Sequence, residues 1–123
     1  MLSSQESKTG MQTLKSFAKS IKFKYQEDKI IEQVLAHICK TYTQHYSKDK
    51  YQATEFIIDA GHGKGFCIGN VLKYAQRYGK KGSHEDHKKD LLKIIHYAII
   101  ALFIHNKEGV SNDQGWSKER KSP

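Results

Sequence analysis

Hydrophobic residues recur three and four positions apart along most of the chain, which is the spacing of amphipathic helices. This pattern predicts five helices, at about residues 11–21, 27–42, 53–60, 66–78 and 84–105. No segment alternates strictly between hydrophobic and polar residues, so the sequence predicts no sheet. We therefore expect an all-α fold: a single small domain of about five helices, with a central antiparallel helix pair and a disordered C-terminal tail.

The hydrophobic faces of the longer helices predict the core. In the second helix this face consists of Ile30, Ile31, Val34, Leu35, Ile38 and Cys39. In the fourth helix it consists of Ile68, Val71, Leu72 and Ala75. In the fifth it consists of Leu91, Leu92, Ile95, Ile99, Leu102 and Phe103. The first helix has a stripe of its own, which we expect to lie on the body of the domain or on a neighbouring subunit. That stripe is Met11, Leu14, Phe17, Ala18 and Ile21.

Residues with capping and turn preferences predict where several helices end. Thr54 is a candidate N-cap for the third helix, and Gly61 is a candidate stop. Residues 79–82, Gly-Lys-Lys-Gly, predict a turn that lets the fifth helix fold back on the fourth. Ser83 followed by Asp86 reads as a capping box at the start of the fifth helix.

The glycine-rich segment 61–65, Gly-His-Gly-Lys-Gly, lies just before the fourth helix. Glycines in this position can expose backbone N–H groups to a phosphate. No predicted strand precedes the segment, however, and the chain has no GxxxxGK[ST] motif, so we expect a flexible connector.

Polar residues also recur at helical spacing, on the last two predicted helices. One stripe is Asn70, Lys73, Tyr74 and Arg77. The other is Asp86, Asp90, Lys93 and Tyr97. Two such stripes facing each other would form a phosphate-binding and base-stacking site. The alternative is that both are solvated helix faces, which are common.

The chain is basic, with a formal net charge of +8. The excess divides between residues 1–50, with 9 basic and 5 acidic groups, and residues 69–97, with 7 and 3. This distribution suits an anionic partner such as a nucleotide or nucleic acid, although a positive charge can serve solubility alone.

Cysteine usage and hydropathy bear on the compartment. The two cysteines, Cys39 and Cys67, lie among apolar neighbours, and we expect buried free thiols in a reducing cytoplasm. No apolar run approaches the roughly 20 residues of a membrane span, and the N-terminus lacks the apolar core of a signal peptide. The sequence thus predicts a cytoplasmic protein with no membrane partner and no metal site.

Several motifs together resemble the SaV-like proteins, a small helical bacteriophage family of mostly unknown function. The resemblance covers about residues 45–100. It is carried by His45-Tyr46, Thr54-Glu55-Phe56-Ile57-Ile58-Asp59, residues 69–78 (GNVLKYAQRY), Lys81, Asp90-Leu91, Lys93 and Tyr97. The family is similar to the nucleotide kinase of short-tailed coliphages, which phosphorylates deoxynucleoside monophosphates without a P-loop. The chain departs from the family in several respects: Leu92 and Ile94 stand where lysine and alanine are usual, the segment 84–89 is longer than usual, and the N-terminal 40 residues match no part of the family.

The resemblance implies a role for each matching residue. The phosphate contacts would be Lys73, Arg77, Lys81 and Lys93, with Lys73, Arg77 and Lys93 as the candidate catalytic set. Asn70 would read a base or ribose edge, and Tyr74 or Tyr97 would stack on the base. The remaining candidate ligand-binding residues are His45, Tyr46, Glu55, Asp59 and Asp90. Of these, His45, Glu55 and Asp59 could hold a hydroxyl, a metal or a lysine, and a salt bridge from Glu55 and Asp59 to the Lys73/Arg77 face is the structural alternative.

The predicted organisation follows from these matches. Residues 1–44 form an N-terminal helical extension for oligomerisation or packing, 45–106 the SaV-like nucleotide-binding core, and 107–123 a flexible tail. We expect a homo-oligomer, because one small helical chain offers little concave surface.

Three functions fit this organisation. The first is a nucleotide-binding protein acting as a nucleoside monophosphate kinase, with ATP and Mg²⁺ as the cofactors that this activity would use, in the cytoplasm of an infected host cell. The second is a non-catalytic protein that sequesters a nucleotide signal during infection. The third is an accessory protein that binds nucleic acid.

Overall fold

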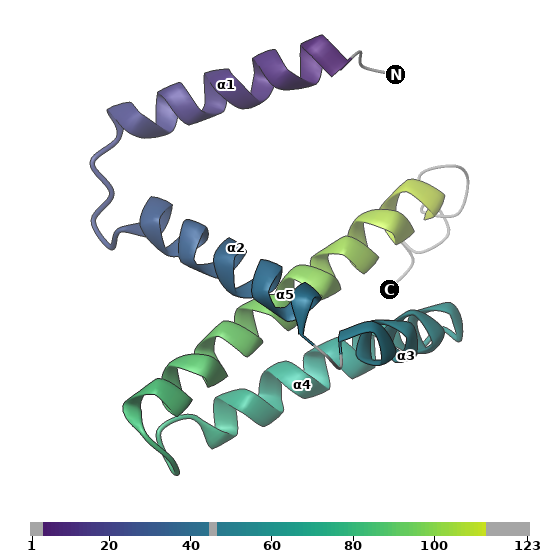
Figure 1. Ribbon diagram of the computed structural model, residues 1–123. Helices are drawn as coiled ribbons and strands as arrows, with labels where there is room; N and C mark the ends of the chain where they lie inside the picture. Colours follow the sequence, from purple (N-terminus) through teal and green to yellow (C-terminus); the bar gives the residue numbers. More distant parts are fainter. Residues whose placement is uncertain (1–3, 45–46, 113–123) are drawn as a thin grey trace, which may run out of the picture. The chain divides into compact units, whose positions relative to one another are not determined.

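The fold is all-α, as the hydrophobic pattern predicted (Figure 1). The computed structural model describes residues 4–44 and 47–112, and within them it contains helices but no strand. The helices are α1 (Ser4–Ser20), α2 (Glu27–Thr43), α3 (Ser47–Asp59), α4 (Gly63–Arg77) and α5 (His84–Asn112). In this part of the chain, no helix combines the length and apolar character needed to cross a lipid bilayer.

The chain divides into two compact units, Met1–Leu35 and Ala36–Pro123. The boundary falls inside α2, whereas the sequence had suggested a division at 44/45. The first unit holds α1 and the start of α2. The second holds the end of α2 together with α3, α4 and α5, and it contains both candidate sites discussed below.

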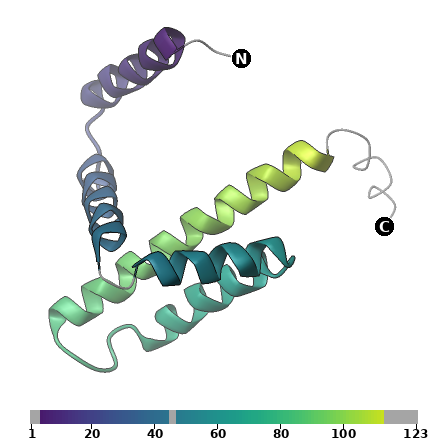
Figure 2. The same cartoon turned by 45° about the vertical axis from the view of Figure 1, so that its right-hand side comes forward.

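The centre of the second unit is the predicted antiparallel pair of α4 and α5, which lie side by side in Figures 1 and 2. Helix α3 packs on α4. Cys67, Tyr97 and Ile104 are the buried apolar residues of this core. Around them pack Ile58, Phe66, Val71, Tyr74, Ile100 and Ala101.

The buried face of α5 differs from the prediction. Asp90, Tyr97 and Ile104 are buried at steps of seven residues. Leu91, Ile99, Leu102 and Phe103, which the sequence assigned to the core, are exposed. In α4, likewise, Ile68 and Leu72 are exposed, although Val71 packs on the core. These assignments were wrong because hydrophobic residues surround much of α5, and periodicity alone does not identify the side that α4 covers.

The apolar face of α2 is also less buried than predicted. Val34 is buried, but Ile30, Ile31 and Leu35 are exposed, and so is Cys39. An amphipathic pattern shows that a face is apolar, but it does not show that the same chain covers it. Of the two cysteines, only Cys67 is buried, and this burial raises the pKa of its thiol.

The apolar stripe of α1 is exposed as well. Met11, Leu14 and Phe17 each leave more than half of their surface accessible, at 56%, 61% and 63%. The helix also begins earlier than the hydrophobic pattern indicated, because Ser4–Gly10 extend it with polar residues.

Helices α3 and α5 also extend beyond their predicted bounds. Helix α3 begins at Ser47, so Thr54 lies inside it and donates a hydrogen bond of 3.0 Å to the carbonyl oxygen of Lys50 rather than capping the N-terminus. Helix α5 continues to Asn112, so residues 107–112 of the predicted flexible tail are helical. The rest of that tail, 113–123, lies outside the described residues.

The segment between α3 and α4 is shorter than the predicted connector. Gly61, with φ of +88°, follows the end of α3 and confirms the predicted stop. Helix α4 already begins at Gly63, so the expectation of a flexible connector was wrong from that residue onward. Gly63 is buried, because the side chains of Ile58 and Ile104 occupy the space where a side chain would stand.

The turn between α4 and α5 has the predicted chemistry. Gly79 and Gly82 both have positive φ, which other residues adopt only with strain. Asp86 accepts hydrogen bonds from the backbone N–H and the hydroxyl of Ser83, and its own N–H donates to Ser83 Oγ. This reciprocal pairing confirms the capping box and holds the pKa of Asp86 below its ordinary value.

Two neighbouring glycines test the packing of Gly63. A methyl group at Gly63 would stand 2.8 Å from Ile104 Cδ1 and 2.9 Å from Ile58 Cγ1. Gly63→Ala should therefore lower the free energy of unfolding by about 1–3 kcal/mol. Gly65→Ala is the matched control, since nothing lies within 4 Å of its added carbon, and it should gain up to about 1 kcal/mol from helix propensity. Urea denaturation followed by circular dichroism measures both, and equal stability of the two variants would contradict this packing.

Candidate functional site

A buried carboxylate lies between α4 and α5. Asp90 is only 1% exposed, and its partner is Arg77 on the facing helix. Arg77 Nη2 lies 3.0 Å from Asp90 Oδ1, and Arg77 Nε donates to Oδ2 at 3.4 Å. The Nη2–Oδ1 approach lacks hydrogen-bond geometry, and no other described group donates to Oδ1. Asp90 therefore depends on Arg77 for its charge compensation, which makes this pair a structural link between the helices.

The aromatic rings of Tyr74 and Tyr97 stack beside this pair, with centroids 6.1 Å apart and planes inclined by 14°. Three cations surround Tyr74: Lys73 Nζ and Lys93 Nζ each lie 5.0 Å from its centroid, and Arg77 Cζ lies at 5.5 Å. The quadrupole of an aromatic ring attracts cations at such distances. The two polar stripes seen in the sequence thus face each other in part.

A pocket of about 330 Å³, here called the cationic pocket, opens on the α5 side of this seam. It is lined by His37, Lys40, Thr41, Gln44, Lys50, Lys89, Lys93, His96 and Tyr97. Side chains from α2, α3 and α5 contribute, and none of the lining residues is a carboxylate. Four lysines gathered around one cavity without acids create a strongly positive local potential.

Burial and the surrounding positive charge both lower the pKa values of the two histidines of the cationic pocket. Burial is the main cause that lowers the pKa of His37, followed by the charges of Lys93, Lys50 and Lys40. Burial likewise lowers the pKa of His96, followed by Lys50 and His37. The two rings meet edge to face with centroids 6.4 Å apart. Both effects favour the neutral form of each imidazole when no anion is bound.

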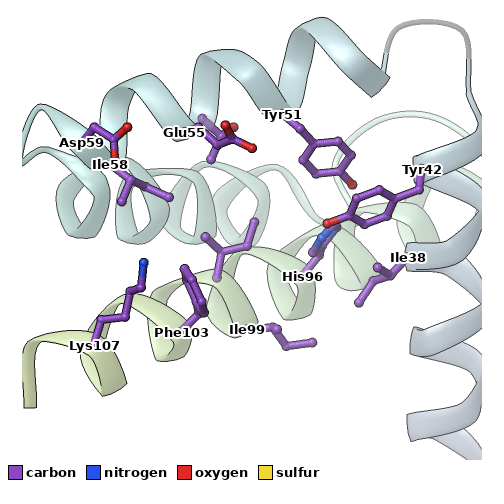
Figure 3. Close-up of a pocket in the computed structure, with 12 residues that line it drawn as sticks. Ile38, Tyr42, Tyr51, Glu55, Ile58, Asp59, His96, Ile99, Phe103 and Lys107 are labelled. Atoms are coloured by element: carbon purple, nitrogen blue, oxygen red, sulfur yellow. The ribbon is translucent and has the colours of Figure 1, made fainter. Parts of the chain in front are cut away.

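A second, larger pocket of about 640 Å³ lies between α3 and α5, here called the apolar pocket (Figure 3). It is lined by Ile38, Tyr42, Tyr51, Thr54, Glu55, Ile58, Asp59, His96, Ile99, Ile100, Phe103 and Lys107. Tyr42 and Tyr51 lie at one end of it and Lys107 at the other.

The tyrosine pair of the apolar pocket borders the cationic pocket. The Tyr42 and Tyr51 rings stack with centroids 4.3 Å apart and planes inclined by 12°. The hydroxyl of Tyr51 shares a hydrogen bond of 2.5 Å with Thr41 Oγ1, which lines the cationic pocket. His96 lines both pockets, so these side chains form the wall between them.

The structure distributes the candidate residues over several places. Lys93 and Tyr97 line the cationic pocket, and Lys73, Tyr74, Arg77 and Asp90 lie along the adjoining helix seam. Glu55 and Asp59 line the apolar pocket instead. The predicted salt bridge from these two acids to Lys73 and Arg77 is not formed among the described residues, because Arg77 pairs with Asp90.

Four further candidates have local roles or no described position. The side-chain amide of Asn70 donates a hydrogen bond of 2.9 Å to the carbonyl oxygen of Phe66, one turn earlier in α4. Lys81 lies in the turn, where its carbonyl oxygen is 3.1 Å from His87 Nε2. His45 and Tyr46 lie outside the described residues.

Sequence reasoning missed most of the cationic pocket. The missed residues are His37, Lys40, Thr41, Gln44, Lys50, Lys89 and His96. A signal was present, since Lys89, Lys93 and His96 share one face of α5 at steps of four and three. On α2, Lys40 and Thr41 follow His37 by three and four residues and so share its face. Among the residues that the structure describes, no group of three or more histidine, cysteine or carboxylate side chains is arranged to hold a metal ion.

The link between the helices can be tested by removing its cation. Arg77→Leu should lower the free energy of unfolding by about 2–4 kcal/mol, because it leaves the buried Asp90 carboxylate without compensation. Lys73→Leu, which removes a neighbouring charge from the same helix, is the control and should cost much less. The double variant Arg77→Leu/Asp90→Asn should recover part of the loss in chemical denaturation. Equal effects of the two single substitutions would show that the pair does not stabilise the fold.

Comparison with known proteins identifies a related segment. Residues 40–98 match the model of the DUF3310 family, which is described as a protein of unknown function. No functionally curated protein and no solved structure matches the chain. The matched segment includes α3, α4 and the first half of α5, and it contains every residue of the cationic pocket except His37. The chain is thus similar to this family over the region that carries most of the cationic pocket and part of the apolar pocket.

Proposed function

We propose that this protein binds a nucleotide through its phosphate in the cationic pocket. The observation that carries the proposal is the lining itself: four lysines and two histidines converge there without a carboxylate. Lysine ammonium groups act as point charges toward phosphate oxygens, and a group with two negative charges would relieve their mutual repulsion.

The surroundings of the cationic pocket also suit a nucleotide. The apolar pocket, which shares His96 with it, offers the stacked rings of Tyr42 and Tyr51 and several aliphatic side chains. Ligand pockets commonly combine such apolar walls with a few polar groups that fix orientation. A phosphate near Lys93 and a base against an apolar wall would use both kinds of surface.

The activity that we propose for this site is phosphoryl transfer to deoxynucleoside monophosphates. The support is the resemblance of residues 45–100 to a family that is similar to such a kinase. Phosphoryl transfer depends mainly on positioning and on neutralising charge, and a cluster of lysines can supply the second of these. Of the four phosphate contacts that the resemblance implies, Lys93 lies in the cationic pocket.

Sequestration of a nucleotide without turnover is the second candidate function. Arg77 favours it, because the guanidinium that the kinase hypothesis assigns to phosphate is engaged by the buried Asp90. A planar guanidinium fork is the group best suited to a transferring phosphoryl group, and lysines do not replace its geometry. Retention without turnover requires no such fork, because lysines can hold a phosphate as point charges.

Binding should depend on the lysines of the cationic pocket. Lys93→Gln and Lys50→Gln should each weaken the affinity for deoxynucleoside monophosphates by about tenfold, which corresponds to about 1.4 kcal/mol. Isothermal titration calorimetry at fixed ionic strength measures the affinity. Lys80→Gln removes the same charge from the turn outside the pocket and should leave the affinity unchanged. Equal affinities in all three variants, or tighter binding of long single-stranded DNA than of any mononucleotide, would overturn the proposal.

Turnover separates the two candidate functions. Purified protein is incubated with ATP, Mg²⁺ and a panel of nucleoside and deoxynucleoside monophosphates, and diphosphate formation is followed by chromatography. A kinase should produce one or two diphosphates, and the rate should fall at least tenfold in Lys93→Gln but not in Lys80→Gln. Recovery of intact nucleotide after denaturing a loaded protein that forms no diphosphate would rule out the kinase and support sequestration.

A further inference from the structure

We infer that the cationic pocket takes the terminal phosphate of a monoester, and that His37 and His96 take up protons as this group binds. The inference rests on the proposed function and specifies its ligand class and its dependence on pH.

The convergence of cations from three helices favours a terminal phosphate. His37 and Lys40 come from α2, Lys50 from α3, and Lys89 and Lys93 from α5. Such an arrangement can surround a group that is attached to its molecule at one point, with three oxygens available. The phosphodiester of a nucleic acid has two free oxygens, and the chain must leave the pocket on both sides.

The volume of the cationic pocket also favours a small group. At about 330 Å³ it lies near the lower end of the usual range for ligand sites, about 300–1,000 Å³.

His37 and His96 form part of the wall of the cationic pocket. His96 is buried and His37 is partly buried, and both line the cavity among the lysines. The titratable groups facing them are Lys40 on α2, Lys50 and Tyr51 on α3, and Lys89, Lys93 and Tyr97 on α5. Beyond His96, the apolar pocket adds Tyr42, Glu55, Asp59 and Lys107. A phosphate among the lysines would offset the positive field that now opposes a charge on either ring. A protonated imidazole donates from both nitrogens, and hydrogen bonds between ionised groups are the stronger ones.

The direction of the pH dependence follows from linkage. In the empty pocket, burial and the lysines lower the pKa of both histidines below its ordinary value near 6.5. A bound anion raises both pKa values, so the complex holds more protons than the free protein. Affinity for the anion therefore rises as the pH falls through the pKa values of the complex, and it levels off below those of the free protein. Each proton taken up contributes at most about tenfold in affinity per pH unit.

Sulfate is the probe for proton uptake, because it remains a dianion throughout the range in which histidine titrates, whereas a phosphate monoester has its own pKa near 6. The dissociation constant of sulfate, measured by calorimetry at constant ionic strength, should fall at least about tenfold from about pH 8 to about pH 5.5. In parallel, NMR titration of the histidine ring protons in the unmodified protein should show that saturating sulfate raises two pKa values. His37→Gln and His96→Gln should each reduce the pH slope, while His105→Gln, at an exposed position of α5 outside the pocket, should retain it.

The outcomes distinguish the inference from the function on which it rests. Sulfate that binds with equal affinity across this pH range, with unshifted histidine resonances, would overturn proton uptake and leave nucleotide binding in place. Absence of binding by sulfate and by every nucleotide would overturn the proposed function itself. Methyl phosphate and dimethyl phosphate test the ligand class at about pH 7.5, which lies above the ordinary pKa of histidine. The monoester should bind at least about tenfold more tightly, and equal affinities would overturn selection for a terminal phosphate.

Discussion

The pairing of Asp90 with Arg77 is the constraint on which the second unit depends. A carboxylate that is 1% exposed requires a compensating charge, and Arg77 of the facing helix α4 supplies it. This fixes the register of α4 against α5 and sets Tyr74 against Tyr97 in the same seam. With that register fixed, the face of α5 that carries Lys89, Lys93 and His96 turns toward the residues of α2 and α3. A charge buried between two helices thus determines where the exposed charges gather.

The sequence predicted those parts of the fold that depend on neighbours along the chain. Helical spacing identified the five helices of the described residues, and the Ser83–Asp86 pair with Gly79 and Gly82 predicted the turn and the cap. Each of these features is decided within a few residues, by hydrogen bonds and backbone conformations that local sequence controls. The polar residues that begin α3 and end α5 carry no hydrophobic pattern, and for that reason the predicted helices were too short.

Contacts between distant segments were harder to foresee. Periodicity could not identify Tyr97 rather than Ile99 as a core residue, because both belong to a helix with hydrophobic residues on several sides. Nor could it combine Lys40 of α2 with Lys93 of α5, since only the folded chain brings these helices to one cavity. The family resemblance implied roles for Lys93 and Tyr97, but it covers about residues 45–100 and therefore did not include His37.

The core of the second unit is built largely from two helices that are neighbours in sequence and joined by a short turn. Contacts that are local along the chain cost little loop entropy and tend to form early, whereas those between distant segments form late. The α4–α5 pair is therefore the part of this unit best placed to nucleate folding. A long segment separates Lys40 and His37 from Lys89 and Lys93, so we expect the charged cavity to be completed late in folding. Mutual repulsion among the lysines of the cavity then opposes its closure, but it does not oppose formation of the α4–α5 core.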